Sequence, residues 1–316
     1  MTTYHWGMIG TGDIAEQFAA NFSNEHSRLM GVTARKLAKT QTFAQKHQIP
    51  NVYESIDDLL NDPAIDIIYV AVPNNLHHDY IMKALEKNKH VLCEKAITMD
   101  LKQLDDEIKL AQKKDLILQE AMTIFNMPLY HKLKQMAASG KLGALKMIQA
   151  PFGSYKEPDP ENRFFNPALA GGALLDIGTY AVSFARWFLN ESPTVLFSEM
   201  VPFKTGVDES SITVLKNNKD ELASVNLSFQ AKMPKEGIVA YEKAYLTIND
   251  YPRAQTARLT YSTGESELIT AGKTEEALNY EVANMIHAIK TKENPSLPLT
   301  KDVITILDDM RQQWQH

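Results

Sequence analysis

Apolar positions in the first part of the chain alternate between runs that suit buried strands and spacings that suit amphipathic helices. The stretch 65–72 is almost continuously apolar, which is typical of a parallel strand covered on both faces. After a first strand at 4–9, apolar residues recur with helical spacing over 15–22. Further strands are predicted at 29–34, 90–93 and 116–119, and helices at 37–47, 80–87 and 101–113. This alternation predicts right-handed βαβ units in a doubly wound parallel sheet.

The pattern changes after residue 121. A helix at 129–138 and a strand at 144–152 precede a polar loop at 153–170, and an apolar helix follows at 174–189. From 194 to 270 the pattern predicts strands only, and two helices follow at 275–291 and 301–314. The clearest of these strands are 210–215, 223–229, 244–248, 257–261 and 267–270. We therefore predict an α/β protein with two domains, 1–121 with the parallel sheet and 122–316 with a large, mostly antiparallel open sheet.

Composition narrows the function. The chain has 316 residues, of which 44% are hydrophobic and 23% charged, as expected for a globular protein with a substantial core. The formal net charge is −6 and no basic run is interleaved with aromatic residues, so nucleic acid is not an expected partner. Cys93 is the sole cysteine, which excludes an intrachain disulfide. Without a secretory pattern at the start or an apolar run long enough to cross a membrane, we expect a cytoplasmic protein without a membrane partner.

A glycine-rich turn follows the first predicted strand, in the order Gly10-Thr11-Gly12-Asp13-Ile14-Ala15. Gly10 permits the turn, Gly12 lets the backbone approach a pyrophosphate, and Ala15 lets helix and strand pack closely. The start of the helix offers free N–H groups to phosphate oxygens. An ordinary βα turn can show the same pattern, but its place after the first strand favours a dinucleotide site formed by Gly10, Thr11, Gly12, Asp13 and Ile14.

Arg35 and Lys36 follow the second predicted strand. An acidic residue here would hold the ribose 2′-hydroxyl of NAD, whereas cations suit the 2′-phosphate of NADP. We therefore favour NADP(H) over NAD(H). The alternative is that both cations simply face solvent at the start of a helix.

Two polar stretches follow later strands of the same predicted sheet. Pro73, Asn74 and His77 lie just after the strand 65–72, at the edge where such sheets bind ligands. Asn74 alone could cap a helix, and His77 could be a surface histidine or face the cofactor. Glu94 and Lys95 end another strand; Lys95 beside a nicotinamide could hydrogen-bond a substrate hydroxyl or carbonyl, while the alternative is an exposed ion pair worth little.

The last stretch with candidate chemistry begins at Gly171-Gly172 and includes Asp176 and Tyr180. Asp176 and Tyr180 are four positions apart, so on an α-helix they would share a face. The two glycines allow close backbone approach. A tyrosine beside a lysine can transfer protons, although an Asp–Tyr pair at this spacing is also an ordinary helix feature.

Taken together, these motifs resemble the glucose–fructose oxidoreductase, inositol dehydrogenase and MocA-like (Gfo/Idh/MocA) family. The resemblance covers nearly the whole chain: GxGxxA at 10–15, Pro-Asn-x-x-His at 73–77, Glu-Lys at 94–95 and Gly-Gly-x-x-x-Asp-x-Gly at 171–178. Within the family the chain is most similar to the dimeric dihydrodiol/D-xylose dehydrogenase branch, on the basis of Glu120-Ala121 and of a tyrosine four residues after the aspartate. It departs from the family pattern in having Ala96 where proline is usual, and 122–126 lack the branch's tryptophan and arginine.

The resemblance implies an N-terminal Rossmann domain and a C-terminal substrate-binding domain whose sheet forms a homodimer or homotetramer. It places Lys95, Asp176 and Tyr180 around the reacting carbon. We expect an NADP(H)-dependent oxidoreductase of sugar, polyol or dihydrodiol substrates, with Tyr180 as general acid/base, Lys95 lowering its pKa and Asp176 orienting the substrate or Lys95. No metal is expected. The alternative function is a non-catalytic dinucleotide-binding sensor or co-regulator of the same fold.

Overall fold

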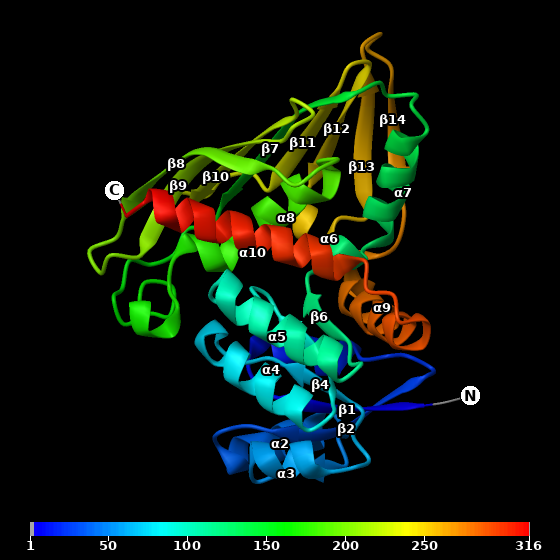
Figure 1. Cartoon of the computed structure of the whole chain (residues 1–316), viewed down its shortest axis with the longest axis vertical. Coiled ribbons are helices and arrows are strands. Elements are labelled where there is room, and N and C mark those ends of the chain that lie inside the picture. Colours follow the sequence, from blue (N-terminus) through cyan, green and yellow to red (C-terminus); the bar gives the residue numbers. More distant parts are fainter. Residues whose placement is uncertain (1–2, 316) are drawn as a thin grey trace. The chain divides into compact units, whose positions relative to one another are not determined.

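The computed structural model describes residues 3–315 and divides the chain into two compact units (Figure 1). The first unit runs through Ala121 and also includes Leu278–Leu297, and the second comprises Met122–Ala277 and the chain from Pro298 onward. The first segment of this unit ends at Ala121, and the chain returns to the unit at Leu278. The returning segment contains α9 (Ala277–Thr291), whose Val282 and Met285 are fully buried in the same apolar core as Trp6.

The first unit has a six-stranded sheet in the order β3-β2-β1-β4-β5-β6. Every neighbouring pair is parallel. The strands are β1 (Tyr4–Ile9), β2 (Ser27–Thr33), β3 (Asn51–Val52), β4 (Ile67–Val70), β5 (His90–Glu94) and β6 (Leu118–Ala121). This is the strand order of the Rossmann fold, and it confirms the predicted sheet.

Five further helices belong to the first unit and pack around its sheet (Figure 1). They are α1 (Asp13–Asn21), α2 (Leu37–Lys46), α3 (Ile56–Asn61), α4 (His77–Glu86) and α5 (Leu101–Lys113). All four residues of β4 are buried, as its apolar run predicts, and the ring of Tyr69 stacks on Phe18 of α1 at 3.8 Å between centroids. Helix α4 begins three residues earlier than predicted, because the 3₁₀ turn Asn74–Leu76 leads directly into it.

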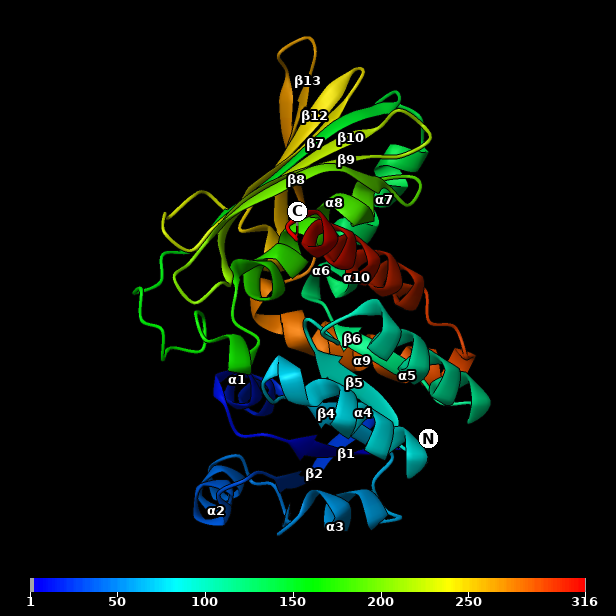
Figure 2. The ribbon, with the colours of Figure 1, turned by 60° about the vertical axis from the view of Figure 1, so that its left-hand side comes forward.

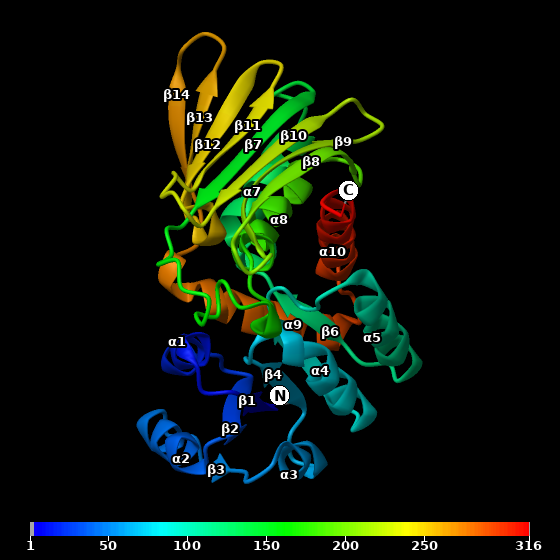
Figure 3. The same ribbon diagram turned by 90° about the vertical axis from the view of Figure 1, so that its left-hand side faces the viewer.

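The second unit has an eight-stranded sheet in the order β14-β13-β12-β11-β7-β10-β9-β8 (Figure 3). Only β7 and β10 pair in parallel, so the predicted antiparallel sheet is confirmed. The strands are β7 (Leu145–Gly153), β8 (Thr194–Pro202), β9 (Asp208–Lys216), β10 (Leu222–Ser228), β11 (Glu236–Tyr241), β12 (Ala244–Asn249), β13 (Thr256–Tyr261) and β14 (Ser266–Thr270).

Helices cover one face of this sheet, as the view in Figure 2 makes clear. They include α6 (Thr123–Asn126), α7 (Pro128–Ala138), α8 (Thr179–Phe188) and α10 (Ser296–Gln313), which belongs to this unit from Pro298 onward. Helix α8 packs on β7 and β10, and the chain after α10 reaches β8 through a hydrogen bond from Trp314 Nε1 to Ser198 Oγ (2.9 Å). The stretch Pro167–Phe188 is long and apolar enough to cross a membrane by length and composition alone, yet 67% of its most apolar window is buried inside the protein.

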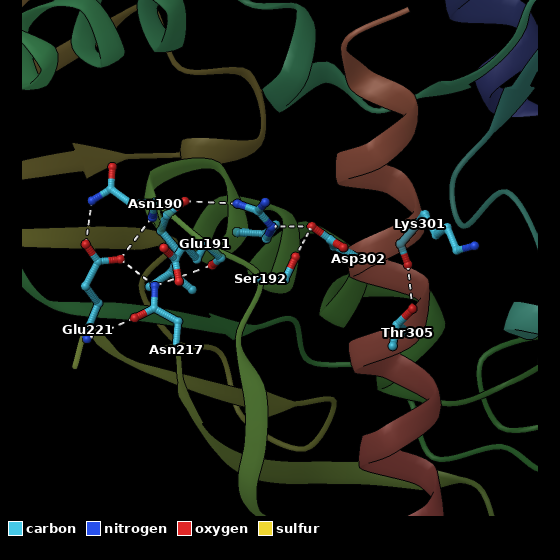
Figure 4. Close-up of polar contacts among 10 residues, drawn as sticks. Asn190, Glu191, Ser192, Asn217, Glu221, Lys301, Asp302 and Thr305 are labelled. Atoms are coloured by element: carbon cyan, nitrogen blue, oxygen red, sulfur yellow. Dashed lines mark hydrogen bonds and ion pairs between the residues drawn. The ribbon is translucent and has the colours of Figure 1, made fainter. Parts of the chain in front are cut away.

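A polar network fixes the chain just after α8 (Figure 4). The buried Glu221 carboxylate accepts hydrogen bonds from Asn190 N (2.9 Å), from the Asn190 side chain and from Asn217 Nδ2 (2.6 Å). Near the end of α8, Arg186 Nε donates to Asp302 Oδ2 of α10 (2.7 Å), which also accepts from Ser192 Oγ. The C-terminal end of α8 is therefore anchored to both the sheet and α10.

Candidate functional site

Strand register places the candidate cofactor residues along one edge of the parallel sheet. Ile9 pairs with Thr33 on one side and Val70 on the other, and Val70 pairs in turn with Cys93. The segments that leave β1, β2, β4 and β5 therefore begin next to one another at the carboxyl edge. Strands β1 and β4 are neighbours, and from them the sheet order runs outward in opposite directions, to β2 and β3 on one side and to β5 and β6 on the other. Ligands bind at this switch point in such sheets.

The glycines of the first turn meet different surroundings. Gly10 has φ +116°, and a Cβ there would lie 2.1 Å from the Ala71 carbonyl oxygen, so the backbones of β1 and the β4 loop require glycine. Gly12 has an ordinary φ of −83°, is exposed, and a Cβ there would meet nothing within 4 Å. Gly12 precedes α1 without a side-chain cap, and Ala15 of α1 is fully buried. The protein itself makes no demand for glycine at 12, whereas a phosphate held at this helix start would.

Arg35 and Lys36 are both exposed, and Lys36 is the N-cap residue of α2. Within residues 3–315, the ion pairs involve neither of them; α2 pairs with α1 through Lys46 Nζ and Glu16 Oε2 at 2.7 Å. The two cations thus lie at the carboxyl end of β2 with their charge directed to solvent or ligand.

The side chain of His77 lies in the interior and is not exposed to solvent. Its ring is fully buried, with Nδ1 3.0 Å from the Ala96 carbonyl oxygen and Nε2 2.9 Å from the Val72 carbonyl oxygen. Burial lowers the pKa of His77, which favours the neutral ring. A neutral ring has one N–H, so it donates a hydrogen bond to one of the two carbonyl oxygens and packs against the other, between the loops that follow β4 and β5. Pro73 is exposed, and Asn74 is half-buried at the start of the 3₁₀ turn.

Glu94 and Lys95 are not the exposed ion pair that the sequence left open. Glu94 is buried, and its Oε1 accepts a hydrogen bond from Tyr69 Oη (2.5 Å). Its Oε2 accepts from the Lys95 backbone N–H (3.3 Å). Lys95 is half-buried, and its peptide bond to Ala96 is cis. The turn that presents Lys95 is therefore anchored on buried groups of the first unit.

That anchoring continues one residue beyond the turn. Glu120 at the end of β6 is buried, and its Oε1 accepts from Ile97 N at 3.0 Å. The turn at Lys95 thus has fixed contacts before it, at Glu94, and after it, at Ile97.

In the second unit, Asp176 lies in a short π-helix, Leu174–Gly178, that runs into α8. The prediction of one regular helix over 174–189 is wrong for this first turn, and with it the expectation that Asp176 and Tyr180 share an α-helical face. A π-helix has wider turns than an α-helix and often marks a functional site. Tyr180 is half-buried, with its ring centroid 6.2 Å from that of Phe152.

The loop before this helix brings cations and aromatic rings next to Asp176. Arg163 NH2 lies 3.9 Å from Asp176 Oδ1, and the Arg163 guanidinium and Lys156 Nζ each lie 4.2 Å from the ring centroid of Phe164. Phe165 is fully buried and packs on Phe203, with centroids 4.3 Å apart. The loop is thus anchored through Phe165 and carries Arg163 to Asp176.

One residue of this region was missed from the sequence. The buried carboxylate of Asp208, the first residue of β9, accepts a hydrogen bond from Leu174 N at 2.7 Å. No local pattern indicated this contact, because it joins residues 34 positions apart. Among residues 3–315 no cluster of three or more His, Cys, Asp and Glu side chains has metal-binding geometry.

Comparisons with known proteins define the family. Residues 4–122 match the oxidoreductase family with an NAD-binding Rossmann fold, and residues 130–247 match the GFO/IDH/MocA C-terminal domain. Trans-1,2-dihydrobenzene-1,2-diol dehydrogenase of Xenopus laevis is 30% identical over 98% of this chain and 97% of its own length. D-xylose 1-dehydrogenase (NADP(+)) 2 of Haloferax volcanii is 28% identical over 94% and 93%. The chain belongs to the GFO/IDH/MocA oxidoreductase family, and the resemblance drawn from its motifs is confirmed.

Solved structures show the same fold along the whole chain. KijD10, a 3-ketoreductase from Actinomadura kijaniata in complex with NADP and TDP-benzene, has a TM-score of 0.87 at 20% identity and covers 99% of this chain and 98% of its own. Levoglucosan dehydrogenase in complex with NADH and levoglucosan has a TM-score of 0.88 at 17% identity and covers 99% and 97%. At these identities the match concerns the fold, which both NADP- and NADH-binding proteins share.

Proposed function

We propose that this protein transfers hydride between NADP(H) and a hydroxyl or carbonyl carbon of a sugar, polyol or dihydrodiol. The observation that carries the proposal is the Gly12 turn: it follows β1 of a Rossmann sheet, leaves open space at an uncapped helix start, and belongs to an oxidoreductase family. The relatives named as dihydrodiol and D-xylose dehydrogenases support the substrate class.

The residues that would hold the cofactor come from the first unit. Gly10, Thr11, Gly12, Asp13 and Ile14 would surround the pyrophosphate, and Pro73, Asn74, Glu94 and Lys95 would line the edge toward the nicotinamide. His77 belongs to this proposal as the buried group that holds the two flanking loops. Arg35 and Lys36 would bind the 2′-phosphate, which favours NADP(H) over NAD(H).

The chemistry proposed for the chain is proton transfer and orientation, while bound nicotinamide supplies or accepts the hydride. Tyr180 gives a proton to the substrate oxygen during reduction and takes it during oxidation. Lys95 donates a hydrogen bond to the same oxygen and, as a cation, favours the ionised form of Tyr180. Asp176 accepts a hydrogen bond from a substrate hydroxyl or from Lys95. This assignment requires that Lys95 and the pair Asp176–Tyr180 meet at one substrate.

The direct test is the appearance of reduced nicotinamide when the purified protein is mixed with NADP, then with NAD, across D-xylose, D-glucose, inositol and a trans-dihydrodiol. Turnover that is faster with NADP supports both the activity and the cofactor preference. Equal efficiency with NAD would remove the role of Arg35 and Lys36. Absence of turnover, combined with tight NADPH binding in a fluorescence titration, would favour a non-catalytic sensor.

Assembly through the second sheet is part of the same proposal. The face that the helices leave uncovered exposes large apolar side chains, at Phe197, Ile212 and Tyr245 among others, which are 43–50% exposed. Such a face on an antiparallel sheet is suited to burial by a second copy of the chain. We expect a homodimer or homotetramer by light scattering, and a smaller particle after Phe197→Glu with Ile212→Glu. Leu37→Glu, at an exposed leucine of the first unit, is the matched control.

The cellular location proposed is the cytoplasm. Cys93 is free and buried, and burial raises the pKa of its thiol well above the ordinary value, so it behaves as a core residue. Fractionation of cells that produce the protein would test the location.

A further inference from the structure

The carboxylate of Asp208 closes the start of the helical segment that carries Asp176 and Tyr180. Asp208 is 9% exposed, and its Oδ2 accepts from the Leu174 N–H at 2.7 Å. Leu174 is the first residue of the π-helix, so its N–H is among those that no helical carbonyl can satisfy. The backbone N–H groups of Ala173 and of Asp208 itself also donate toward this carboxylate. Asp208 is therefore a cap that reaches the helix from a distant strand.

The second glycine of the pair, Gly172, makes room for this cap. Gly172 has φ +119°, and a Cβ there would lie 2.2 Å from Asp208 Oδ1. The glycine at 172 thus permits close approach of the protein's own carboxylate. Any side chain at this position would both strain the backbone and push the cap away.

The two ends of the helical segment are held in different ways. Its C-terminal end is held by the Glu221 and Asp302 contacts shown in Figure 4. Its N-terminal end is held by Asp208 through the N–H of Leu174. Leu174 lies two residues before Asp176 and six before Tyr180. Loss of the cap frees the end that carries both groups and leaves the other end fixed. A displacement of about 1 Å of such groups can reduce a rate by about 10²-fold.

We infer that ionised Asp208 is a positioning residue for the reaction, because its capping of the segment at Leu174 sets where Asp176 and Tyr180 lie. This inference rests on the proposed function in one respect, the roles of those two side chains. Asp208 itself touches neither substrate nor cofactor in this scheme.

The cap is sensitive to pH. Burial raises the pKa of Asp208 to about 7, while the N–H donors of Leu174 and Ala173 and the charge of Arg311 on α10 act in the opposite direction. A proton on one oxygen removes an acceptor that the backbone N–H groups use. The cap is therefore complete above pH 7 and weakens as pH falls through 7, and we expect kcat to fall with it.

Asp208→Asn tests the kinetic part, because the amide imitates the protonated carboxyl. We expect kcat to drop about 10- to 100-fold, the fall of kcat near pH 7 to disappear, and the Kd of NADPH to change less than twofold. The matched control is Glu107→Gln on α5, because Glu107 is also buried with a pKa raised to about 7. That variant should keep the fall near pH 7. A pH profile that persists in Asp208→Asn, or one that disappears in Glu107→Gln, would overturn the inference.

Hydrogen exchange tests the cap without any substrate. At pH 8, the amides of 172–178 should exchange at least tenfold faster in Asp208→Asn than in the wild-type protein. In the wild-type protein the same amides should exchange faster at pH 6 than at pH 8, after correction for intrinsic rates. Gly172→Ala disturbs the same contact from the other side and should give the same result. If Asp208→Asn exchanges faster but the wild-type protein turns over no substrate, the capping role of Asp208 stands and only the proposed function is contradicted. Unchanged exchange would overturn the inference itself.

Discussion

Gly10 and Gly12 are two residues apart in the same turn, yet the structure predicts opposite consequences for an added methyl group. In Gly10→Ala the new Cβ would lie 2.1 Å from the Ala71 carbonyl oxygen, and φ of +116° is unfavourable for alanine. A residue held in such a conformation costs roughly 1–3 kcal/mol, and the backbone contact adds to this. We expect the free energy of unfolding to fall by about 3 kcal/mol or more.

Gly12→Ala meets nothing within 4 Å and has an ordinary φ of −83°. Its cost to folding is therefore limited to the weaker preference for alanine at an N-cap, about 1 kcal/mol or less. If a phosphate lies against this position, the methyl group displaces it from at least one N–H donor. A charge-assisted hydrogen bond is worth about 1.5–3 kcal/mol, so the Kd of NADPH should rise roughly 10- to 150-fold.

Urea unfolding and NADPH fluorescence titration of both variants separate the two effects. The expected result is a large loss of stability in Gly10→Ala, and near-wild-type stability with weak cofactor binding in Gly12→Ala. Unchanged NADPH affinity in Gly12→Ala would refute the placement of the pyrophosphate at the start of α1. A Gly12→Ala variant as unstable as Gly10→Ala would show that the open space at Gly12 has been misjudged.

Three other perturbations follow from the described contacts. Tyr180→Phe should lower kcat by about 10²–10⁴-fold with thermal stability unchanged, as measured by steady-state kinetics and calorimetry. Arg35→Ala with Lys36→Ala should reduce kcat/KM for NADP by about 10²-fold and that for NAD by less than about threefold, because only NADP carries the 2′-phosphate. Glu221→Ala removes the acceptor of two part-buried N–H donors of Asn190 and of the buried Asn217 Nδ2, so unfolding in urea should show a loss of about 1–3 kcal/mol.

The fold was largely predictable because the buried parallel strands are short apolar runs with clear breaks. The run at 65–72 contains β4, and the glycine turn lies between β1 and α1 as expected. Two features escaped prediction because they depend on contacts between distant segments. Helix α9 completes the core around Trp6. Strand β11 contains Gly237, a residue type that usually indicates a break in a strand. The closeness of Gly237 to the Phe184 ring explains that glycine.

The candidate site was predictable in its residue types and less so in their roles. His77 was weighed as a surface or cofactor-facing residue, but its two contacts to backbone carbonyl oxygens make it a link between loops. Glu94 was weighed as half of an exposed ion pair, but it is buried against Tyr69. Spacing alone suggested a regular helix for Asp176, whereas the structure has a π-helix whose first N–H donates to Asp208. In each case one deciding partner lies 19 or more positions away in the chain: Ala96 for His77, Tyr69 for Glu94 and Asp208 for Leu174.

The glycines of the two motifs show why the sequence pattern and the physical cause must be separated. Gly10 makes room for a backbone carbonyl, Gly172 for a carboxylate of the same chain, and Gly12 for nothing that the protein supplies. A glycine that the folded chain does not require, placed at an uncapped helix start, is the position where an external ligand best explains the residue. The same reasoning makes Gly172 part of the support for Asp176. The two units therefore use glycine in two ways: Gly12 leaves open space at the start of α1, and Gly172 makes room for the carboxylate that caps the helical segment carrying Asp176.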